Sequence, residues 1–276
     1  ALDIVRSSHR AMVRDVTVSA RDVSHGQDIV ARVRKIPGVK VMTVSDPTFL
    51  RHLRGKIEVR SRSPIKTRGD LMKIDNPGSY RVSAAIHNSP ASVWNLTTKG
   101  NTVAVVTDGS AVLGLGNIGP SAAIPVMEGK AVLFKELAGV DAWPVCLDTQ
   151  ELGEIVRSVK AIAPSFGAIN LEDISAPRCF AVEEQLKAEL SIPVIHDDQH
   201  CTAITVLAGL YNALTIVHKN LAEVKVVVCG VGAAGAATGQ LLFAAGVRNI
   251  IGYDVEGVLH RSQKHESHPG KKWFAN

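Results

Sequence analysis

The chain has 276 residues, of which 46% are hydrophobic and 4% are aromatic, and its formal net charge at pH 7 is +5. This length allows two domains with a sizeable core, and the apolar, aromatic-poor composition favours an α/β protein with buried parallel strands. No apolar stretch approaches the roughly 18 residues of a membrane span and no signal-peptide pattern opens the chain, so we expect a soluble protein without a membrane partner.

The cysteines and the charged segments indicate the cellular location and the kind of partner. The four cysteines are Cys146, Cys179, Cys201 and Cys229. They show no CxxC spacing, which favours a reducing, cytoplasmic location. Positive charge gathers at residues 51–68 and 260–272, but neither segment carries interleaved aromatics or a nucleic-acid motif. A solvated surface is therefore favoured over a nucleic-acid partner, and attraction of anionic metabolites is the second possibility.

The N-terminal part has the pattern of a small α+β block. Residues 11–20 alternate apolar and polar positions as a half-exposed strand does, and residues 26–36 have a helical stripe that Pro37-Gly38 ends. Further strands are predicted at residues 39–44 and 53–59. A cluster of Ser, Arg and Pro then marks a domain boundary, so we assign residues 1–62 to this block.

After this block the sequence pattern changes to continuous apolar runs, typical of buried strands, separated by helical segments. Residues 103–106 and 142–147 predict buried strands, and residues 121–137 predict the helix between them. A glycine-rich loop, Gly114 to Gly119, precedes this helix. Thr149 is predicted to cap a second helix, whose apolar stripe is Leu152, Ile155, Val156, Val159 and Ile162.

Two pairs of neighbouring carboxylates are the most informative feature of the chain. Glu172-Asp173 and Asp197-Asp198 each follow a short apolar run, and a helical pattern of about a dozen residues separates them. This is the pattern of a βαβ unit, which makes the strands parallel and brings both pairs to the same edge of the sheet.

Four acids at one edge would repel one another unless a cation neutralised them, and hard carboxylate oxygens favour Mg²⁺ or Mn²⁺. The alternative is that one acid of each pair only caps the following helix, which is predicted at residues 202–217 for the second pair.

A nucleotide-binding pattern follows at residues 219–276. The apolar run 225–229 leads into Gly230-x-Gly232-x-x-Gly235, with Ala233 and Ala234 between the last two glycines, and an Ala-rich helix comes next. A second strand, residues 249–253, ends at Asp254. Together these features are typical of a dinucleotide fingerprint, although a structural glycine turn remains the alternative. Asp254 could bind a ribose 2′-hydroxyl, which favours NAD slightly over NADP.

The motifs resemble the bacterial-type malic enzymes along nearly the whole chain. The blocks that carry the resemblance are residues 105–119, 125–131, 167–174, 176–180 and 196–200. Residues 1–62 resemble the latter part of an ACT-type regulatory module. The resemblance implies a parallel-sheet substrate and metal domain at residues 63–218, followed by a truncated Rossmann-type NAD(P)-binding domain at residues 219–276.

The family resemblance implies a reaction and roles for single residues. The reaction is the oxidative decarboxylation of (S)-malate to pyruvate and CO₂, with NAD or NADP and a divalent cation as cofactors. The resemblance also implies a homo-oligomer. Glu172, Asp173 and Asp198 match the metal ligands, Lys130 matches the general base, and Asp197 supports the site. Without the resemblance, Lys130 would be interpreted as a helix-surface lysine.

Two of the chain's departures from the family pattern are near the expected site. Asp75 stands where the family has a proton-donating tyrosine, and Cys201 stands where the family has a glycine. A side chain at position 201 is expected to crowd the site or to require a backbone angle that suits only glycine. Because the chain also lacks an initiator Met and stops early in its cofactor domain, we expect a fragment. The alternative function is a catalytically impaired or truncated homologue that binds a nucleotide or effector.

Overall fold

The computed structural model describes residues 2–7, 12–263 and 268–276 and divides into two compact units, Ala1–Leu53 and Arg54–Asn276. In the first unit, β1 (Leu2–Ser7) pairs antiparallel with β2 (Met12–Val16), and the helices α1 (Val23–Arg34) and α2 (Pro47–His52) follow. The carboxylate of Asp22 caps α1 by accepting a hydrogen bond from the backbone N–H of His25.

The sequence-based expectations for this region are partly right. The predicted strand at 11–20 and helix at 26–36 are present as β2 and α1. The predicted strands at 39–44 and 53–59 are wrong, because both segments lack regular secondary structure. Their apolar side chains, such as Met42 and Val59, are exposed, and β-propensity alone does not form a strand without a partner to pair with. The ACT-like identity of residues 1–62 stays a prediction.

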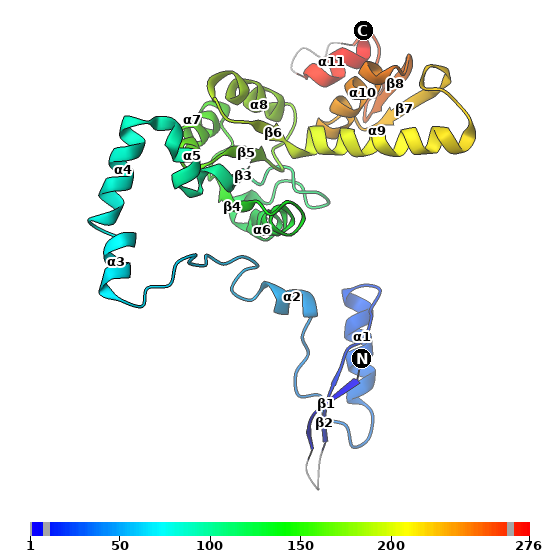
Figure 1. The fold of residues 1–276 in the computed structure, drawn as a ribbon. Helices are drawn as coiled ribbons and strands as arrows, with labels where there is room; N and C mark the ends of the chain where they lie inside the picture. The colour runs from blue at the N-terminus through cyan, green and yellow to red at the C-terminus, as the bar shows by residue number, and fades with distance from the viewer. Residues whose placement is uncertain (1, 8–11, 264–267) are drawn as a thin grey trace. The chain divides into compact units, whose positions relative to one another are not determined.

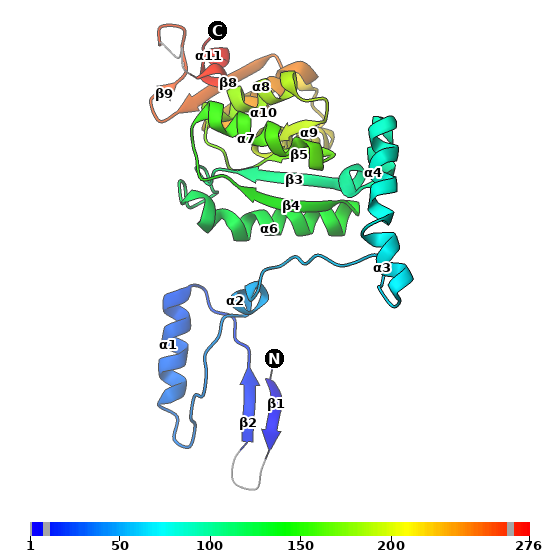
Figure 2. The ribbon, with the colours of Figure 1, turned by 90° about the vertical axis from the view of Figure 1, so that its left-hand side faces the viewer.

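A four-stranded parallel sheet forms the centre of the second unit. Its strand order is β4 (Asp141–Cys146), β3 (Thr102–Thr107), β5 (Ala168–Leu171), β6 (Val194–His196). The helices that connect them are α6 (Gly119–Ala138), α7 (Leu152–Ile162) and α8 (Arg178–Glu189). Figure 2 shows α6 on one side of the sheet and α7 and α8 on the other. After β3 the chain adds β4 on one side of it and then β5 on the other side, so the order of strand addition switches between β3 and β5. In parallel sheets, ligands bind at the carboxyl ends of the strands at such a switch point.

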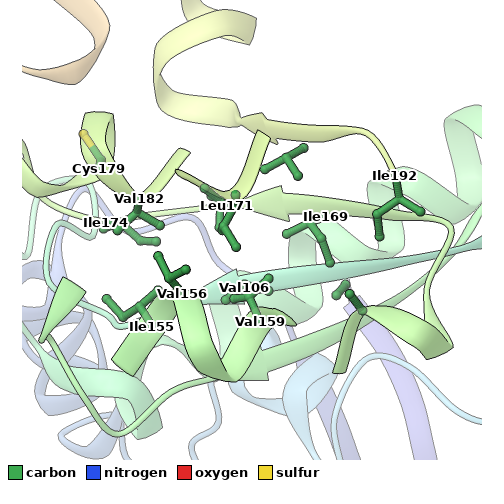
Figure 3. Packing of buried hydrophobic residues seen from close by; sticks show 14 residues of the cluster. Val106, Ile155, Val156, Val159, Ile169, Leu171, Ile174, Cys179, Val182 and Ile192 are labelled. Atoms are coloured by element: carbon green, nitrogen blue, oxygen red, sulfur yellow. The ribbon is translucent and has the colours of Figure 1, made fainter. Parts of the chain in front are cut away.

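The main core lies between this sheet and the two helices α7 and α8 (Figure 3). Ile169 and Leu171 of β5 are completely buried there, together with Ile155 and Val159 of α7 and Val182 of α8. The predicted apolar stripe of α7 is therefore confirmed. Its predicted N-cap is wrong: Glu151 caps the helix, and the hydroxyl of Thr149 bonds to the side chain of Glu154 instead.

A long apolar helix, α9 (Asp197–Val217), follows β6 directly (Figure 1). It is long and apolar enough to cross a membrane, with a mean hydropathy of 1.5, so the expectation that no stretch approaches this length is wrong. The same length and composition also suit a helix of a protein core. Its first turn carries Asp197 and Asp198, and it packs along α10 (Ala233–Ala245).

The last part of the chain forms a second, smaller sheet. β7 (Lys225–Cys229) and β8 (Asn249–Asp254) are parallel and are connected through α10, as the glycine motif predicted. β9 (Gly257–Val258) adds an antiparallel edge, and α11 (Pro269–Ala275) follows. The remaining α-helices are α3 (Arg68–Ile74), α4 (Gly78–Asn88) and α5 (Val93–Leu96), and short 3-10 helices cover Pro90–Ser92, Thr98–Asn101, Ala163–Ser165 and Leu221–Glu223.

Candidate functional site

Three carboxylates converge at the carboxyl ends of β5 and β6. Leu171 and His196 pair in the parallel ladder, so the next residues, Glu172 and Asp197, leave the sheet side by side. One carboxylate oxygen from each of Glu172, Asp197 and Asp198 lies within 4.8 Å of the other two. The expected convergence of acids from two adjacent parallel strands is therefore present in the fold.

Asp173, the fourth acid of the two pairs, contributes to this cluster mainly through its backbone. Its φ is +54°, and its N–H donates to Oδ2 of Asp198 at 3.0 Å. Its own Oδ2 is buried and has no hydrogen-bond partner among the described residues. A buried carboxylate oxygen without a donor is costly, and a bound cation is one way to satisfy it.

The electrostatics of the cluster fit a divalent cation. Burial, followed by the charge of Asp197, raises the pKa of Glu172 to about 8, although Lys130 opposes this. Burial and the charge of Asp198 raise the pKa of Asp173 to about 6. These raised pKa values mean that ionising the carboxyl groups of the cluster together is unfavourable unless a positive charge is bound nearby. Because all the donors are carboxylate oxygens, Mg²⁺ and Mn²⁺ suit the site.

Lys130 extends from α6 into the same cluster. Its Nζ lies 2.8 Å from Oδ2 of Asp197 and 3.3 Å from Oε1 of Glu172. Burial acts to lower the pKa of Lys130, but the hydrogen bond to Asp197 and the charges of Asp197 and Glu172 outweigh it and raise that pKa above its ordinary value. The side chain is only 23% exposed, which does not suit a helix-surface lysine.

The two departures from the family pattern occupy different surroundings. Asp75 ends α3, and among the described residues its carboxylate has no hydrogen-bond or ion-pair partner that would tie it to the carboxylate cluster. Cys201 lies one turn after Asp197 in α9, and burial together with a hydrogen bond from its thiol to Asp197 raises the pKa of Cys201 to about 11. The expectation that position 201 needs a glycine-like backbone angle is wrong, because Cys201 is helical and has no positive φ.

A largely buried polar network at the carboxyl end of β3 was not predicted from the sequence. Nη2 of Arg178 donates to Oδ2 of Asp108 at 2.7 Å, to the hydroxyl of Ser110 at 2.9 Å and to the hydroxyl of Ser175 at 3.1 Å. Asp108 directly follows β3, so its place at the carboxyl end of a central parallel strand was the available signal. Arg178 begins α8 and could be placed only by the fold.

The glycine motif forms a tight turn between β7 and α10. Gly230 has a φ of +92° and donates its N–H to the carbonyl of Tyr253 on the neighbouring strand. A Cβ on Gly235 would lie 2.0 Å from the carbonyl oxygen of Gly230, so only glycine fits there. Gly232 caps α10, and beyond its chain neighbours no atom of the part of the chain that the structure describes would lie within 4 Å of its Cβ. This leaves the N-terminus of α10 open for an anionic group.

Asp254 ends β8, as the motif requires, but it has a partner of its own. Its Oδ2 lies 2.8 Å from Nζ of Lys271 in α11, and its Oδ1 accepts the N–H of Val255. The hydrogen bond from Lys271 holds the pKa of Asp254 below its usual range, so the carboxylate is ionised. A ribose hydroxyl that bonds to Asp254 would therefore donate to a carboxylate that already pairs with Lys271.

Comparisons with known proteins agree with these motifs. The family described as "Malic enzyme, N-terminal domain" matches residues 58–153. The chain is similar to the NAD-dependent malic enzyme of Geobacillus stearothermophilus, with 59% identity over 266 residues, which are 96% of this chain and 56% of that protein. It is also similar to the NADP-dependent malic enzyme of Salmonella typhimurium, with 44% identity over 76% of this chain and 28% of that protein.

Among solved structures, the NAD-dependent malic enzyme of Thermotoga maritima superposes with a TM-score of 0.78 at 44% identity, covering 84% of this chain and 62% of that one. The chain thus spans 56% and 28% of the lengths of these two curated relatives, which is less than two thirds of each. Both NAD-dependent and NADP-dependent enzymes are among its relatives.

Proposed function

Because this chain is homologous to the malic enzymes of the bacterial type, we propose that it provides the metal site and the start of the nucleotide site of an enzyme that oxidises (S)-malate to pyruvate and CO₂ with NAD or NADP. The observation that carries this proposal is the convergence of Glu172, Asp197 and Asp198 with the ammonium of Lys130 at the end of β5 and β6.

In this proposal the metal ligands come from the two carboxylate pairs, with Glu172, Asp173 and Asp198 as the ligands and Asp197 as their support. The unsatisfied oxygen of Asp173 and the raised pKa values of Glu172 and Asp173 favour this arrangement. A divalent cation held there would act as a Lewis acid towards the oxygens of the substrate, and its charge would favour the neutral form of Lys130.

Lys130 is the proposed base for the oxidation step. In its neutral form, Nζ would accept the proton of the C2 hydroxyl of malate, and a bound nicotinamide would supply the hydride acceptor. Asp197, which accepts a hydrogen bond from Lys130, orients the amine towards the cluster. Asp75 occupies the position of the family's proton donor, where a carboxyl group replaces the phenol that would protonate the enolate.

The nucleotide is proposed to bind at the turn Gly230–Gly235, including Ala233 and Ala234 at the start of α10. The positive φ of Gly230, the space around Gly232 and the helix N-terminus support binding of its pyrophosphate. The carboxylate of Asp254 would accept a hydrogen bond from a ribose hydroxyl, which favours NAD over NADP. Residues 219–276 are accordingly proposed as the start of a Rossmann-type domain, residues 63–218 as the substrate and metal domain, and residues 1–62 as an ACT-like module.

Two properties of the whole protein, its location and its assembly, are also proposed. The four cysteines are free, which suits a reducing cytoplasm. Homo-oligomer formation is proposed from the apolar, basic character of the N-terminal block.

The test is malate-dependent formation of reduced nicotinamide, followed by absorbance, with NAD⁺ or NADP⁺ and with or without Mn²⁺. Product should form only with both metal and nucleotide, and Asp198→Ala should abolish it. Full turnover by Asp198→Ala would contradict the metal assignment. If the chain binds nucleotide but ignores malate and Mn²⁺, the alternative of a nucleotide-binding or effector-binding homologue replaces the proposal.

A further inference from the structure

His196 is a completely buried histidine at the end of β6, two residues before the cluster acid Asp198. Its Nε2 lies 3.0 Å from Oδ2 of Asp198, and its Nδ1 lies 3.1 Å from Nε2 of Gln199. The same amide nitrogen of Gln199 lies 3.1 Å from Oε2 of Glu183 in α8. These four side chains form a continuous polar chain from α8 to the metal site.

The donors and acceptors in this chain allow only one arrangement of protons. An ionised carboxylate only accepts hydrogen bonds, so Glu183 requires the amide nitrogen of Gln199, and not its oxygen, to face it. That nitrogen carries two hydrogens, and the second one points to Nδ1 of His196. Nδ1 must therefore accept, which leaves the proton of the neutral imidazole on Nε2, beside Asp198.

Glu183 can impose this arrangement because it is itself fixed. It is only 5% exposed, and its carboxylate also accepts hydrogen bonds from the backbone N–H of His196 and from the side chains of His200 and Lys187. Burial alone would raise the pKa of Glu183, but the hydrogen bonds from Lys187 and His200 hold that pKa below its ordinary value.

The proton on Nε2 matters for Asp198. Oδ2 of Asp198 already accepts the N–H of Asp173 at 3.0 Å, and Nε2 of His196 is its second neighbour, although the two are not in line for a hydrogen bond. With the proton on Nε2, the contact is attractive. With the proton on Nδ1, a nitrogen lone pair would lie 3.0 Å from a carboxylate oxygen and repel it.

We infer that Glu183 and Gln199 are positioning residues of the proposed metal site: they fix the tautomer of His196 that places an N–H, and not a lone pair, beside Oδ2 of Asp198. This inference rests on the proposed function, because it assumes that the carboxylate cluster binds a divalent cation. Groups that orient metal ligands in this way commonly change metal affinity about 10- to 100-fold when they are removed.

The test compares Mn²⁺ binding by the intact 276-residue chain and its variants, with free Mn²⁺ followed by electron paramagnetic resonance. Gln199→Met, which keeps the side-chain volume but removes both donors, should weaken Mn²⁺ binding about 10- to 100-fold. Glu183→Gln should also weaken it, because a neutral amide at position 183 no longer dictates the orientation of Gln199. The matched control is Glu189→Gln, the same change on the same helix, in a residue that pairs with Lys160 outside this network.

A second readout reports the tautomer directly. In ¹⁵N spectra of the imidazole, His196 of the unchanged protein should carry its proton on Nε2, and Gln199→Met should give a mixture of tautomers. A proton on Nδ1 in the unchanged protein would overturn the inference. This measurement also decides the matter if Gln199→Met fails to fold.

The outcomes separate this inference from the proposed function. If the unchanged protein does not bind Mn²⁺, or if Asp198→Ala binds it equally well, the proposed metal site fails and the inference fails with it. If Mn²⁺ binding depends on Asp198 but Gln199→Met and Glu183→Gln bind as tightly as Glu189→Gln, only the inference is overturned.

Discussion

Nη2 of Arg178 lies 2.7 Å from Oδ2 of Asp108, whose side chain is completely buried. The pair joins the first residue of α8 to the turn after β3. We predict that Arg178→Met lowers the free energy of unfolding by about 3–5 kcal/mol, because it leaves a buried carboxylate without its counter-charge. Urea unfolding followed by circular dichroism measures this difference.

The exposed pair of Lys160 and Glu189 provides the control for this prediction. Both side chains are more than two-fifths exposed, so Lys160→Met should change the free energy of unfolding by less than about 1 kcal/mol. An Arg178→Met variant as stable as Lys160→Met would mean that Asp108 is neutralised or solvated by other means.

Two glycines of the nucleotide motif should respond differently to alanine. A Cβ at Gly235 would collide with the carbonyl oxygen of Gly230, so Gly235→Ala should lower the free energy of unfolding by about 1–3 kcal/mol, whether or not nucleotide is present. The Cβ of Gly232→Ala meets no atom of the described residues within 4 Å beyond its chain neighbours, so this variant should leave stability within about 0.5 kcal/mol. Its methyl group would instead occupy the space proposed for the pyrophosphate.

Urea unfolding measures both stabilities, and calorimetry with NAD⁺ measures binding by the folded variants. The expected result for Gly232→Ala is weaker NAD⁺ binding at unchanged stability. If Gly232→Ala binds NAD⁺ normally, the turn serves the packing of α10 alone, and the nucleotide proposal loses its main support.

The parts of the fold that follow from local pattern were predicted well. Continuous apolar runs identified β3, β5 and β6, and the βαβ pattern placed Glu172 and Asp197 at one sheet edge, where the structure has them. The apolar segments at 39–44 and 53–59 misled the analysis, since their composition suits strands but the fold offers them no partner strand.

The supporting residues of the site were not predictable in the same way. Asp108 and Arg178 are 70 positions apart in the sequence, and Glu183 and Gln199 are 16 apart, so each pair comes together only through the connections of the sheet. A charged residue inside a helical pattern, such as Glu183, is normally interpreted as exposed, and only the fold places it beneath the end of β6. The place of Lys130 was expected from the family resemblance alone, because its helical pattern suits a surface residue equally well.

Asp75 provides a test of the decarboxylation half of the proposed reaction. Asp75→Tyr would supply a phenol that stays protonated near neutral pH, and we expect it to increase the rates of pyruvate enolisation and oxaloacetate decarboxylation by at least about tenfold. Solvent deuterium exchange into pyruvate, followed by NMR, measures the first step. Asp75→Phe is the matched control, because it adds a ring without the hydroxyl. Equal rates for the Tyr and Phe variants would show that position 75 does not donate the proton.

The raised pKa values of the cluster predict how stability and metal affinity change with pH. Burial and the charge of Asp197 raise the pKa of Glu172 to about 8, and burial and the charge of Asp198 raise that of Asp173 to about 6, so without metal these two groups bind more protons in the folded chain than in the unfolded chain. Without Mn²⁺, their contribution to stability should therefore be lost as pH rises from the ordinary carboxyl range, near 4, towards 8.

Mn²⁺ binding should show the opposite dependence on pH. The cation binds ionised carboxylates and displaces their protons, so its affinity should increase by roughly tenfold or more between pH 6 and pH 8. Calorimetry in two buffers of different ionisation enthalpy counts the protons released. Glu172→Gln should bind Mn²⁺ more weakly and release fewer protons, because its amide does not titrate. If Mn²⁺ binds without releasing protons in this range, the cation does not meet Glu172 in its protonated form, and the ligand assignment must shift towards Asp197 and Asp198.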